Sequence, residues 1–231
     1  MSPETLEAIL NLRSLQLSPK QIARKLGLRP ADVSAVIKQQ ASNLVAEQGP
    51  MLPPLHSCVI NELAAAMLLK RREVSSLDLS LPEAGKTQVF ILRSDRGKHL
   101  LTGFLVDFWC LGVKDCLGPR KVKLEEYYFL LENTLEKTGR PMIEITLEEA
   151  QSIVYGVVDY AQTLGFKPHK DFEQSKAYLG PRPDTLIPIE FGRNGKPFYE
   201  QGIEDNVQKI LTTLSNNLSP DEFDYRLKPK F

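Results

Sequence analysis

The sequence predicts an α+β protein in which an N-terminal three-helix helix-turn-helix unit precedes a larger domain whose antiparallel hairpins are covered by helices. Three observations lead to this prediction. Apolar residues recur at helical spacing through residues 3–40, with Gly27 where the chain must turn. Residues 49–54 then hold three prolines and a glycine, which end regular structure and mark a boundary. Beyond them, runs rich in β-branched and aromatic residues flank polar turns, and helical patterns lie between these runs.

The N-terminal unit is expected to contain three short helices. The first spans residues 3–16, and the second begins at Ser18-Pro19, because serine caps a helix N-terminus and proline is accepted in its first turn. Ala23 is small enough for two helices to cross closely, and Gly27 supplies the left-handed residue that ends the second helix. The third helix is expected over residues 30–40.

Three regions follow from this pattern: a helix-turn-helix domain over residues 1–42, a proline-containing linker over residues 43–57 and an α+β domain over residues 58–231. The linker is expected to be stiff and non-helical, because the apolar periodicity fades there and proline cannot continue a helix.

The elements of the α+β domain are predicted from periodicity, caps and turns. They are expected to form an antiparallel sheet with helices on one face. In chain order we expect a helix at 60–72, a hairpin of strands 87–93 and 100–110, helices at 124–137, 147–164 and 170–179, a second hairpin of strands 187–191 and 197–199 around Asn194-Gly195, and a last helix at 205–218.

Composition indicates a globular protein without an overall bias toward nucleic acid. The chain has 29 basic and 29 acidic residues, 25% charged residues and 42% hydrophobic ones. Residues 18–40, however, contain five basic side chains and only one acidic one, Asp32. A local basic patch of this kind fits a small nucleic-acid footprint.

Three other features of the sequence lead us to expect a cytoplasmic protein without a membrane partner. The N-terminus lacks the basic and apolar regions of a secretory signal. The longest apolar stretch, residues 100–113, is too short to span a membrane and is interrupted by Asp107. Three cysteines at irregular spacing argue against a disulfide framework and are typical of a reducing compartment.

The helix-turn-helix pattern predicts double-stranded DNA as the partner, with the third helix in the major groove. It resembles the three-helix units of bacterial regulators, sigma-factor region 4 and recombinases. The resemblance covers residues 18–40, although the N-terminal end of the third helix lacks the Arg, Asn and Gln residues that usually read bases. A lone unit of this size needs a second reading element, so a homodimer is an expected assembly. The candidate nucleic-acid-binding residues are Lys20, Arg24, Lys25, Arg29, Ser34 and Lys38.

Four residues of the larger domain are candidates for catalysis. Asp107 lies within the predicted strand 100–110, which is apolar on both faces, so its carboxylate is expected to be partly buried. His169 and Asp171 share a loop, and Glu190 precedes the Asn194 turn. Together they would suit a divalent-metal hydrolytic site, as in a nuclease. In the structural alternative, Asp107 pairs with Lys114 or an arginine, His169 or Asp171 caps the next helix, and Glu190 faces water.

Cofactor motifs are absent from the sequence. There is no phosphate-binding loop and no dinucleotide fingerprint, so no cofactor is expected. His56, Cys58, Cys110 and Cys116 lack the paired spacing of zinc ligands, which favours buried thiols.

Three segments of the larger domain resemble a set of uncharacterised bacterial proteins. They are residues 104–115, 165–172 and 189–198, and the resemblance spans most of residues 58–225. It implies a single domain and no particular activity. Three hypotheses therefore stand: a DNA-binding regulator whose α+β domain senses, dimerises or recruits, a metal-dependent nuclease or hydrolase, and a protein-interaction module without a nucleic-acid role.

Overall fold

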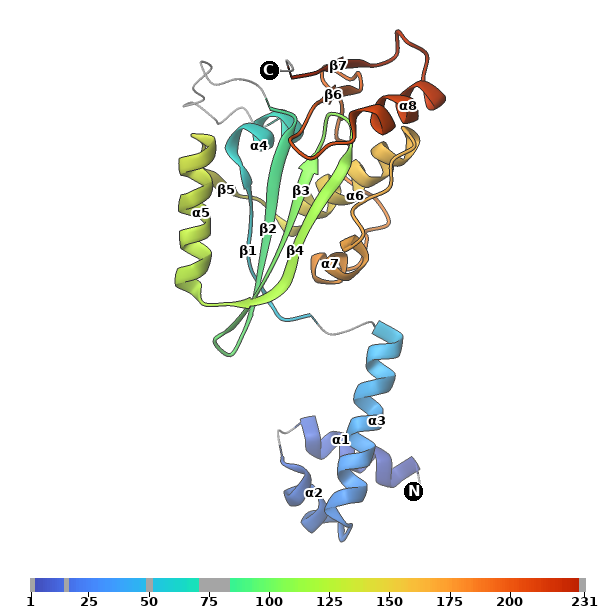
Figure 1. The fold of residues 1–231 in the computed structure, drawn as a ribbon. Helices are drawn as coiled ribbons and strands as arrows, with labels where there is room; N and C mark the ends of the chain where they lie inside the picture. Colours follow the sequence, from blue (N-terminus) through green and yellow to red (C-terminus); the bar gives the residue numbers. More distant parts are fainter. Residues whose placement is uncertain (1–2, 15–16, 49–51, 71–83, 229–231) are drawn as a thin grey trace. The chain divides into compact units, whose positions relative to one another are not determined.

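A computed structural model describes residues 3–14, 17–48, 52–70 and 84–228. The chain divides into two compact units, residues 1–52 and residues 53–231. The mixed α+β class predicted from the sequence is confirmed (Figure 1).

The N-terminal unit contains three helices: α1 (Pro3–Ser14), α2 (Pro19–Leu26) and α3 (Pro30–Gln48). Their shared core consists of Ile9, Ile22, Ala23 and Val33, all at most 2% exposed. Ser18 caps α2 through a capping box with Gln21, as the serine predicted. Gly27 follows α2 at a φ of 64°, in the left-handed region that glycine enters without strain.

The prediction of a non-helical linker over residues 43–57 was wrong at both ends. Helix α3 continues to Gln48, and a strand begins at Leu55. The apolar periodicity does fade after residue 40, but residues 41–48 contain neither glycine nor proline, so nothing in them interrupts a helix already under way.

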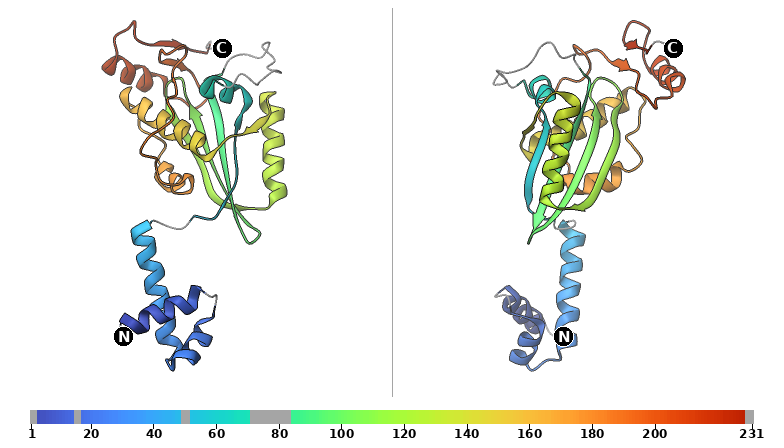
Figure 2. Two further views of the ribbon diagram at one scale, coloured as in Figure 1. Left: turned by 180° about the vertical axis from the view of Figure 1, so that it is seen from behind. Right: turned by 60° about the vertical axis from the view of Figure 1, so that its left-hand side comes forward.

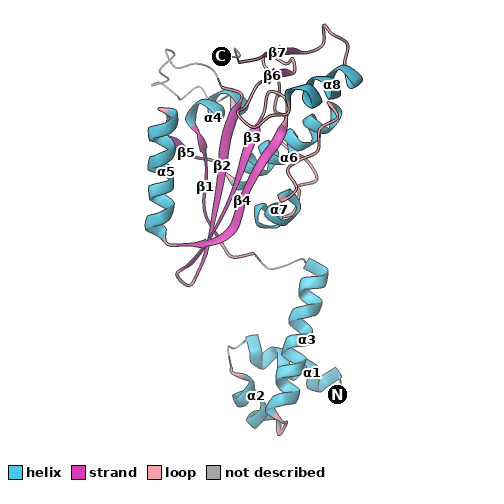
Figure 3. Ribbon diagram, in the orientation of Figure 1, coloured by secondary structure: helices cyan, strands magenta, loops and turns pink. Residues whose placement is uncertain are grey.

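The C-terminal unit is built on a five-stranded antiparallel sheet with the strand order β4-β3-β2-β1-β5 (Figure 3). The predicted first hairpin is confirmed: strands β2 and β3 pair from Lys86↔Asp107 to Asp95↔Lys98. The five strands are β1 (Leu55–Asn61), β2 (Lys86–Asp95), β3 (Lys98–Asp107), β4 (Gly112–Val122) and β5 (Met142–Glu144).

Helices cover both faces of the sheet, so the expectation of one covered face was wrong (Figure 2). Helix α5 (Leu124–Thr138) lies on one face, and α6 (Leu147–Thr163) and α7 (Phe172–Leu179) lie on the other. Two successive residues of β2 explain this. Phe90 belongs to a buried cluster that includes Tyr127 of α5, and Ile91 belongs to a buried cluster that includes Ile153 of α6. A strand that is apolar on both sides has to be buried on both sides.

Three strands of the five-stranded sheet were not predicted, each for a physical reason of its own. Residues 55–61 were partly assigned to a helix at 60–72, but Ile60 pairs with Val89 in the sheet and helix α4 (Glu62–Leu69) begins only afterwards. Residues 71 and 72 lie outside the described residues. Strand β4 contains Gly118-Pro119, which argues against a strand in the sequence, but an edge strand accepts proline. Strand β5 has only three residues, too few for a recognisable alternation.

The end of the chain forms a small layer of its own. It comprises β6 (Phe198–Glu200), α8 (Val207–Asn217) and β7 (Asp224–Arg226), with β6 and β7 paired in parallel. The second predicted hairpin was wrong, since residues 187–191 form no strand and only a bridge between Arg193 and Lys196 closes the turn. The Asn194-Gly195 turn itself is present, with positive φ at both residues. In the chain as far as the structure describes it, no helix is long and apolar enough to cross a membrane.

Candidate functional site

The candidate nucleic-acid-binding residues of the N-terminal unit all lie on its exposed surface. On α3, Ala31, Ser34, Ala35 and Lys38 recur at a spacing of three or four residues and therefore share one exposed face. On α2, the exposed Lys20 and Arg24 are one turn apart, and the exposed Lys25 follows Arg24. The six predicted contact residues, Lys20, Arg24, Lys25, Arg29, Ser34 and Lys38, are each solvent-exposed.

Two of these side chains already have partners within the first turn of α3. The Arg29 guanidinium lies 2.8 Å from the Asp32 carboxylate, and that pairing raises the pKa of Arg29. The Ser34 hydroxyl donates to the Pro30 carbonyl at 2.8 Å. The single acidic residue of this surface is therefore paired with Arg29, and the other basic residues of the surface are Lys20, Arg24, Lys25 and Lys38.

Asp107 is a buried carboxylate at the end of β3. It is 1% exposed, and its Oδ1 accepts a hydrogen bond of 3.0 Å from the backbone N–H of Cys110. Burial raises the pKa of Asp107 to about 6, against the lowering effect of Lys86 and Lys114. The carboxylate thus closes the turn after β3, which is a structural role.

The lysines near Asp107 are engaged with the C-terminal segment. Lys114 forms an ion pair of 2.6 Å with Asp205 rather than with Asp107, so the predicted structural alternative for Asp107 was wrong in its partner. Lys86 donates to the Glu200 carbonyl at 3.1 Å. Asp205 also accepts from the Gly202 N–H and the Tyr199 hydroxyl.

His169 and Asp171 lie near each other, but their side chains are farther apart than a hydrogen bond. The His169 ring is 3.7 Å from Asp171 and 3.8 Å from Asp115. Asp171 occupies the N-cap position of α7 without a side-chain capping bond. Glu190 is on the surface, 3.9 Å from Lys70.

The four candidate catalytic residues therefore do not meet in one metal site. Across residues 3–14, 17–48, 52–70 and 84–228, no three histidine, cysteine or acidic side chains lie close enough to share an ion. Asp107 is sealed in a turn, His169 and Asp171 form a separate pair, and Glu190 contacts a lysine. This arrangement gives the hydrolytic hypothesis no shared site on which to build.

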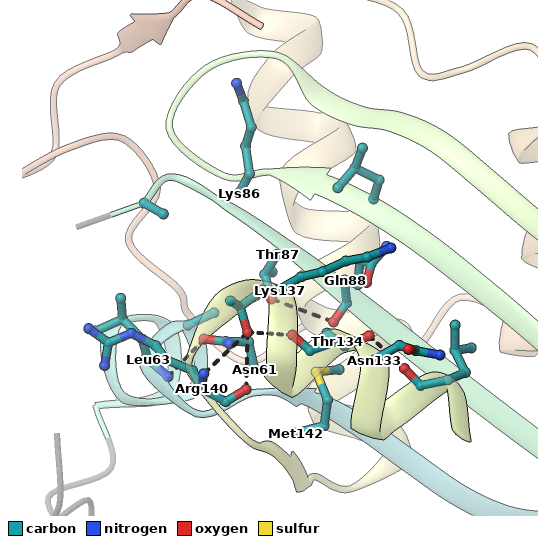
Figure 4. A pocket seen from close by; sticks show the side chains of 15 residues that line it. Asn61, Leu63, Lys86, Thr87, Gln88, Asn133, Thr134, Lys137, Arg140 and Met142 are labelled. Atoms are coloured by element: carbon teal, nitrogen blue, oxygen red, sulfur yellow. Dashed lines mark hydrogen bonds between the residues drawn. The ribbon is translucent and has the colours of Figure 1, made fainter. Parts of the chain in front are cut away.

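A pocket that the sequence analysis missed lies between α5 and the sheet (Figure 4). Its volume is about 450 Å³, within the range of roughly 300–1,000 Å³ that is typical of small-molecule sites. Apolar side chains form much of its wall, and polar side chains interrupt that wall. The lining residues include Leu63, Ala64, Leu105, Leu130 and Met142 among the apolar ones, and Asn61, Thr87, Gln88, Asn133, Thr134, Lys137, Thr138 and Arg140 among the polar ones.

A weak sequence signal for this pocket existed. Leu130, Asn133, Thr134 and Lys137 recur at a spacing of three or four residues, so they share one face of α5. Gln88 directly precedes the apolar run of β2 over residues 89–92. Neither feature indicates a cavity until the helix is placed on the sheet.

Comparisons of this chain with protein-family models, with curated proteins and with solved structures found no match. The resemblances drawn from the sequence motifs therefore stay predictions.

Proposed function

We propose that this protein binds double-stranded DNA through α2 and α3, with the C-terminal unit as an effector domain. The observation that carries the proposal is the exposed basic surface of residues 18–39, where five cations accompany one acidic residue that is already paired. Such a surface favours the DNA backbone, whose phosphates present a regular array of negative charge.

The arrangement of the two helices gives each a different part in this proposal. Lys20 and Arg24, one turn apart on α2, would contact phosphates on either side of the groove. The exposed face of α3 carries small residues, Ala31 and Ala35, which allow its backbone to approach the base edges closely. With few hydrogen-bonding side chains on that face, phosphate contacts would provide most of the affinity and little of the sequence preference.

Electrostatic binding makes a quantitative prediction about salt. Each phosphate neutralised contributes about −0.9 to the slope of log K against log salt concentration, so four or five contacts give a slope of about −4. Fluorescence anisotropy of the full-length protein with a labelled random-sequence duplex, repeated over a salt series, measures this slope. Binding that is absent at low salt would overturn the proposal.

Matched double substitutions locate the surface. Lys20→Ala/Arg24→Ala removes two cations from α2 without disturbing the Arg29–Asp32 pair, and we expect the slope to fall in magnitude by about 2. Arg29→Ala/Lys38→Ala tests α3 in the same way. The control is Lys98→Ala/Lys121→Ala, which removes the same charge from exposed positions of the C-terminal unit. If the α2 and α3 variants bind DNA as the control does, the interface does not lie on these helices.

A further inference from the structure

From the pocket between α5 and β2 we infer a binding site for a small amphipathic anion, a molecule with an apolar body and one carboxylate. This goes beyond the proposed DNA binding and rests on a different part of the chain. The pocket is lined by α5, β2, β3 and the segment from Asn61 to Ala64. None of these residues belongs to the N-terminal unit.

The apolar residues that line the pocket indicate that the body of the ligand is apolar. Leu105 and Leu130 come from the sheet and from α5, and Leu63 and Ala64 come from the first turn of α4. A second hollow of about 180 Å³ shares Gln88, Leu105 and Leu130 with the pocket, and its other lining residues are apolar or glycine except for the exposed Asp115. The apolar surface therefore continues along the groove between helix and sheet, which suits an extended aliphatic or aromatic group.

The charged residues around the pocket indicate that the ligand carries a negative charge. Among its described lining residues three are basic, Lys86, Lys137 and Arg140, and none is acidic. Lys86 is engaged with the Glu200 carbonyl, and Arg140 is 6% exposed and has contacts of its own. Lys137 is exposed on the last turn of α5 and makes no hydrogen bond or ion pair with another described residue.

Two amide side chains stand with Lys137 at the same pocket. The Gln88 and Asn133 side chains are half-buried, and neither side-chain amide has a hydrogen-bond partner within the described part of the chain. By contrast, the Thr134 and Thr138 hydroxyls donate to the carbonyls of Leu130 and Thr134. Figure 4 shows Lys137 extending toward Gln88, while Lys86 points away from the group. An ammonium beside two amides can donate several hydrogen bonds to one carboxylate, and such charge-assisted bonds are the strong ones.

The test uses two fluorescent probes with similar apolar bodies, added to the full-length protein. 1-Anilinonaphthalene-8-sulfonate carries an anionic group, whereas N-phenyl-1-naphthylamine is neutral. We expect the anionic probe to bind with micromolar affinity and to be displaced by octanoate but not by octylamine. Failure of the anionic probe to bind, or equal displacement by the two competitors, would overturn the inference.

Substitutions assign the binding to this pocket. Lys137→Met removes the charge and keeps the apolar stem, so we expect affinity for the anionic probe to fall about tenfold while the neutral probe is unaffected. Asn133→Phe fills the pocket from the half-buried face of α5 and should weaken the binding of both probes. Lys121→Met is the control, because Lys121 is an exposed lysine of β4 outside the pocket.

Unfolded or loosened protein also binds the anionic probe, so each variant is first compared with the unsubstituted chain by its circular dichroism and melting temperature. Among variants that match, a Lys137→Met protein that binds the anionic probe as Lys121→Met does would overturn the assignment of the charge. An Asn133→Phe protein that binds both probes normally would overturn the assignment of the pocket. Neither outcome depends on DNA binding, so this inference and the proposed function fail separately.

Discussion

Lys114 and Asp205 form an ion pair of 2.6 Å that joins strand β4 to the segment before α8, across 91 positions of the sequence. Both side chains are largely buried. Burial alone would raise the pKa of Asp205, but the hydrogen bonds from Lys114 and from the Gly202 N–H outweigh it and lower the pKa below its ordinary value of 3.8. The pair thus holds the C-terminal layer against the edge of the sheet.

Replacing Asp205 with asparagine should destabilise the C-terminal unit. The change leaves the Lys114 ammonium buried without its counter-charge, and breaking a buried pair in this way costs about 3 kcal/mol. Urea unfolding followed by fluorescence measures the loss, because Trp109 is the one tryptophan of the chain and is buried in this unit. Because the pKa of Asp205 is lowered on folding, its stabilising effect should be present above about pH 4 and disappear as the pH falls below that value. A Lys114→Met/Asp205→Asn protein that is no more stable than the single variant would contradict the proposed cause.

Asp107 should give the opposite dependence on pH. Burial raises its pKa from 3.8 to about 6, so between these values the folded protein binds the proton more tightly than the unfolded chain does. The free energy of unfolding should therefore decrease as the pH rises from about 4 to about 6, by up to about 3 kcal/mol from this residue. In Asp107→Asn this decrease should be absent, while the amide oxygen can still accept from the Cys110 N–H. The measurement is the difference in unfolding free energy between the two proteins over this pH range, and a constant difference would refute the assignment.

Arg93 is expected to be a strong determinant of stability. Its guanidinium is 6% exposed and donates to the carbonyls of Tyr178, Pro53 and Leu179, at 2.7, 3.0 and 3.5 Å. It thereby satisfies the last carbonyls of α7 and fixes the chain that enters β1. Arg93→Met leaves the Tyr178 and Pro53 carbonyls without this donor, while Leu179 still accepts from Gln151, and the change should cost about 3 kcal/mol in urea unfolding. Arg93→Lys should recover part of this loss, and equal destabilisation by the two variants would show that the hydrogen bonds are not responsible.

Gly27→Ala should loosen the N-terminal unit by a purely local effect. Gly27 has a φ of 64°, and a Cβ placed on it would meet no heavy atom within 4 Å. The cost is therefore backbone strain, about 1–2 kcal/mol for a left-handed alanine. Hydrogen–deuterium exchange of the full-length chain should show faster exchange in residues 17–39 alone. Gly97→Ala is the matched control, since Gly97 has a φ of 75° and equally open surroundings in the β2–β3 turn. Faster exchange in residues 17–39 of the control would contradict the local interpretation.

The three cysteines should react slowly with thiol reagents. Burial raises the pKa of Cys58 to about 12 and that of Cys116 to about 11, and it also raises the pKa of Cys110. Because the thiolate is the reactive form, labelling with iodoacetamide at pH 8 should be slow and should begin at Cys116, which is only partly buried. In urea all three should react at the rate of a free thiol. Rapid labelling of Cys58 or Cys110 in the folded protein would show that these sites open to solvent.

The sequence by itself determined those features that depend on residues close together in the chain. Ser18 begins α2 and Gly27 ends it, Thr146 begins α6 with a capping box, and Gly139 ends α5. The exposure of the basic residues on α2 and α3 also followed from helical periodicity alone. Caps, turns and periodicity act over a few residues, so they can be read from a short window of sequence.

Only the tertiary structure decided which segments far apart in sequence meet. Lys114 was expected beside Asp107 but pairs with Asp205, and His169 and Glu190 do not join Asp107. The pocket needs α5 laid on the face of β2 that carries Gln88, and the sequence had suggested helices on one face alone. Contacts of this kind depend on strand order and on which face a helix covers. Those choices are made by burial over the whole domain, which no local pattern of residues records.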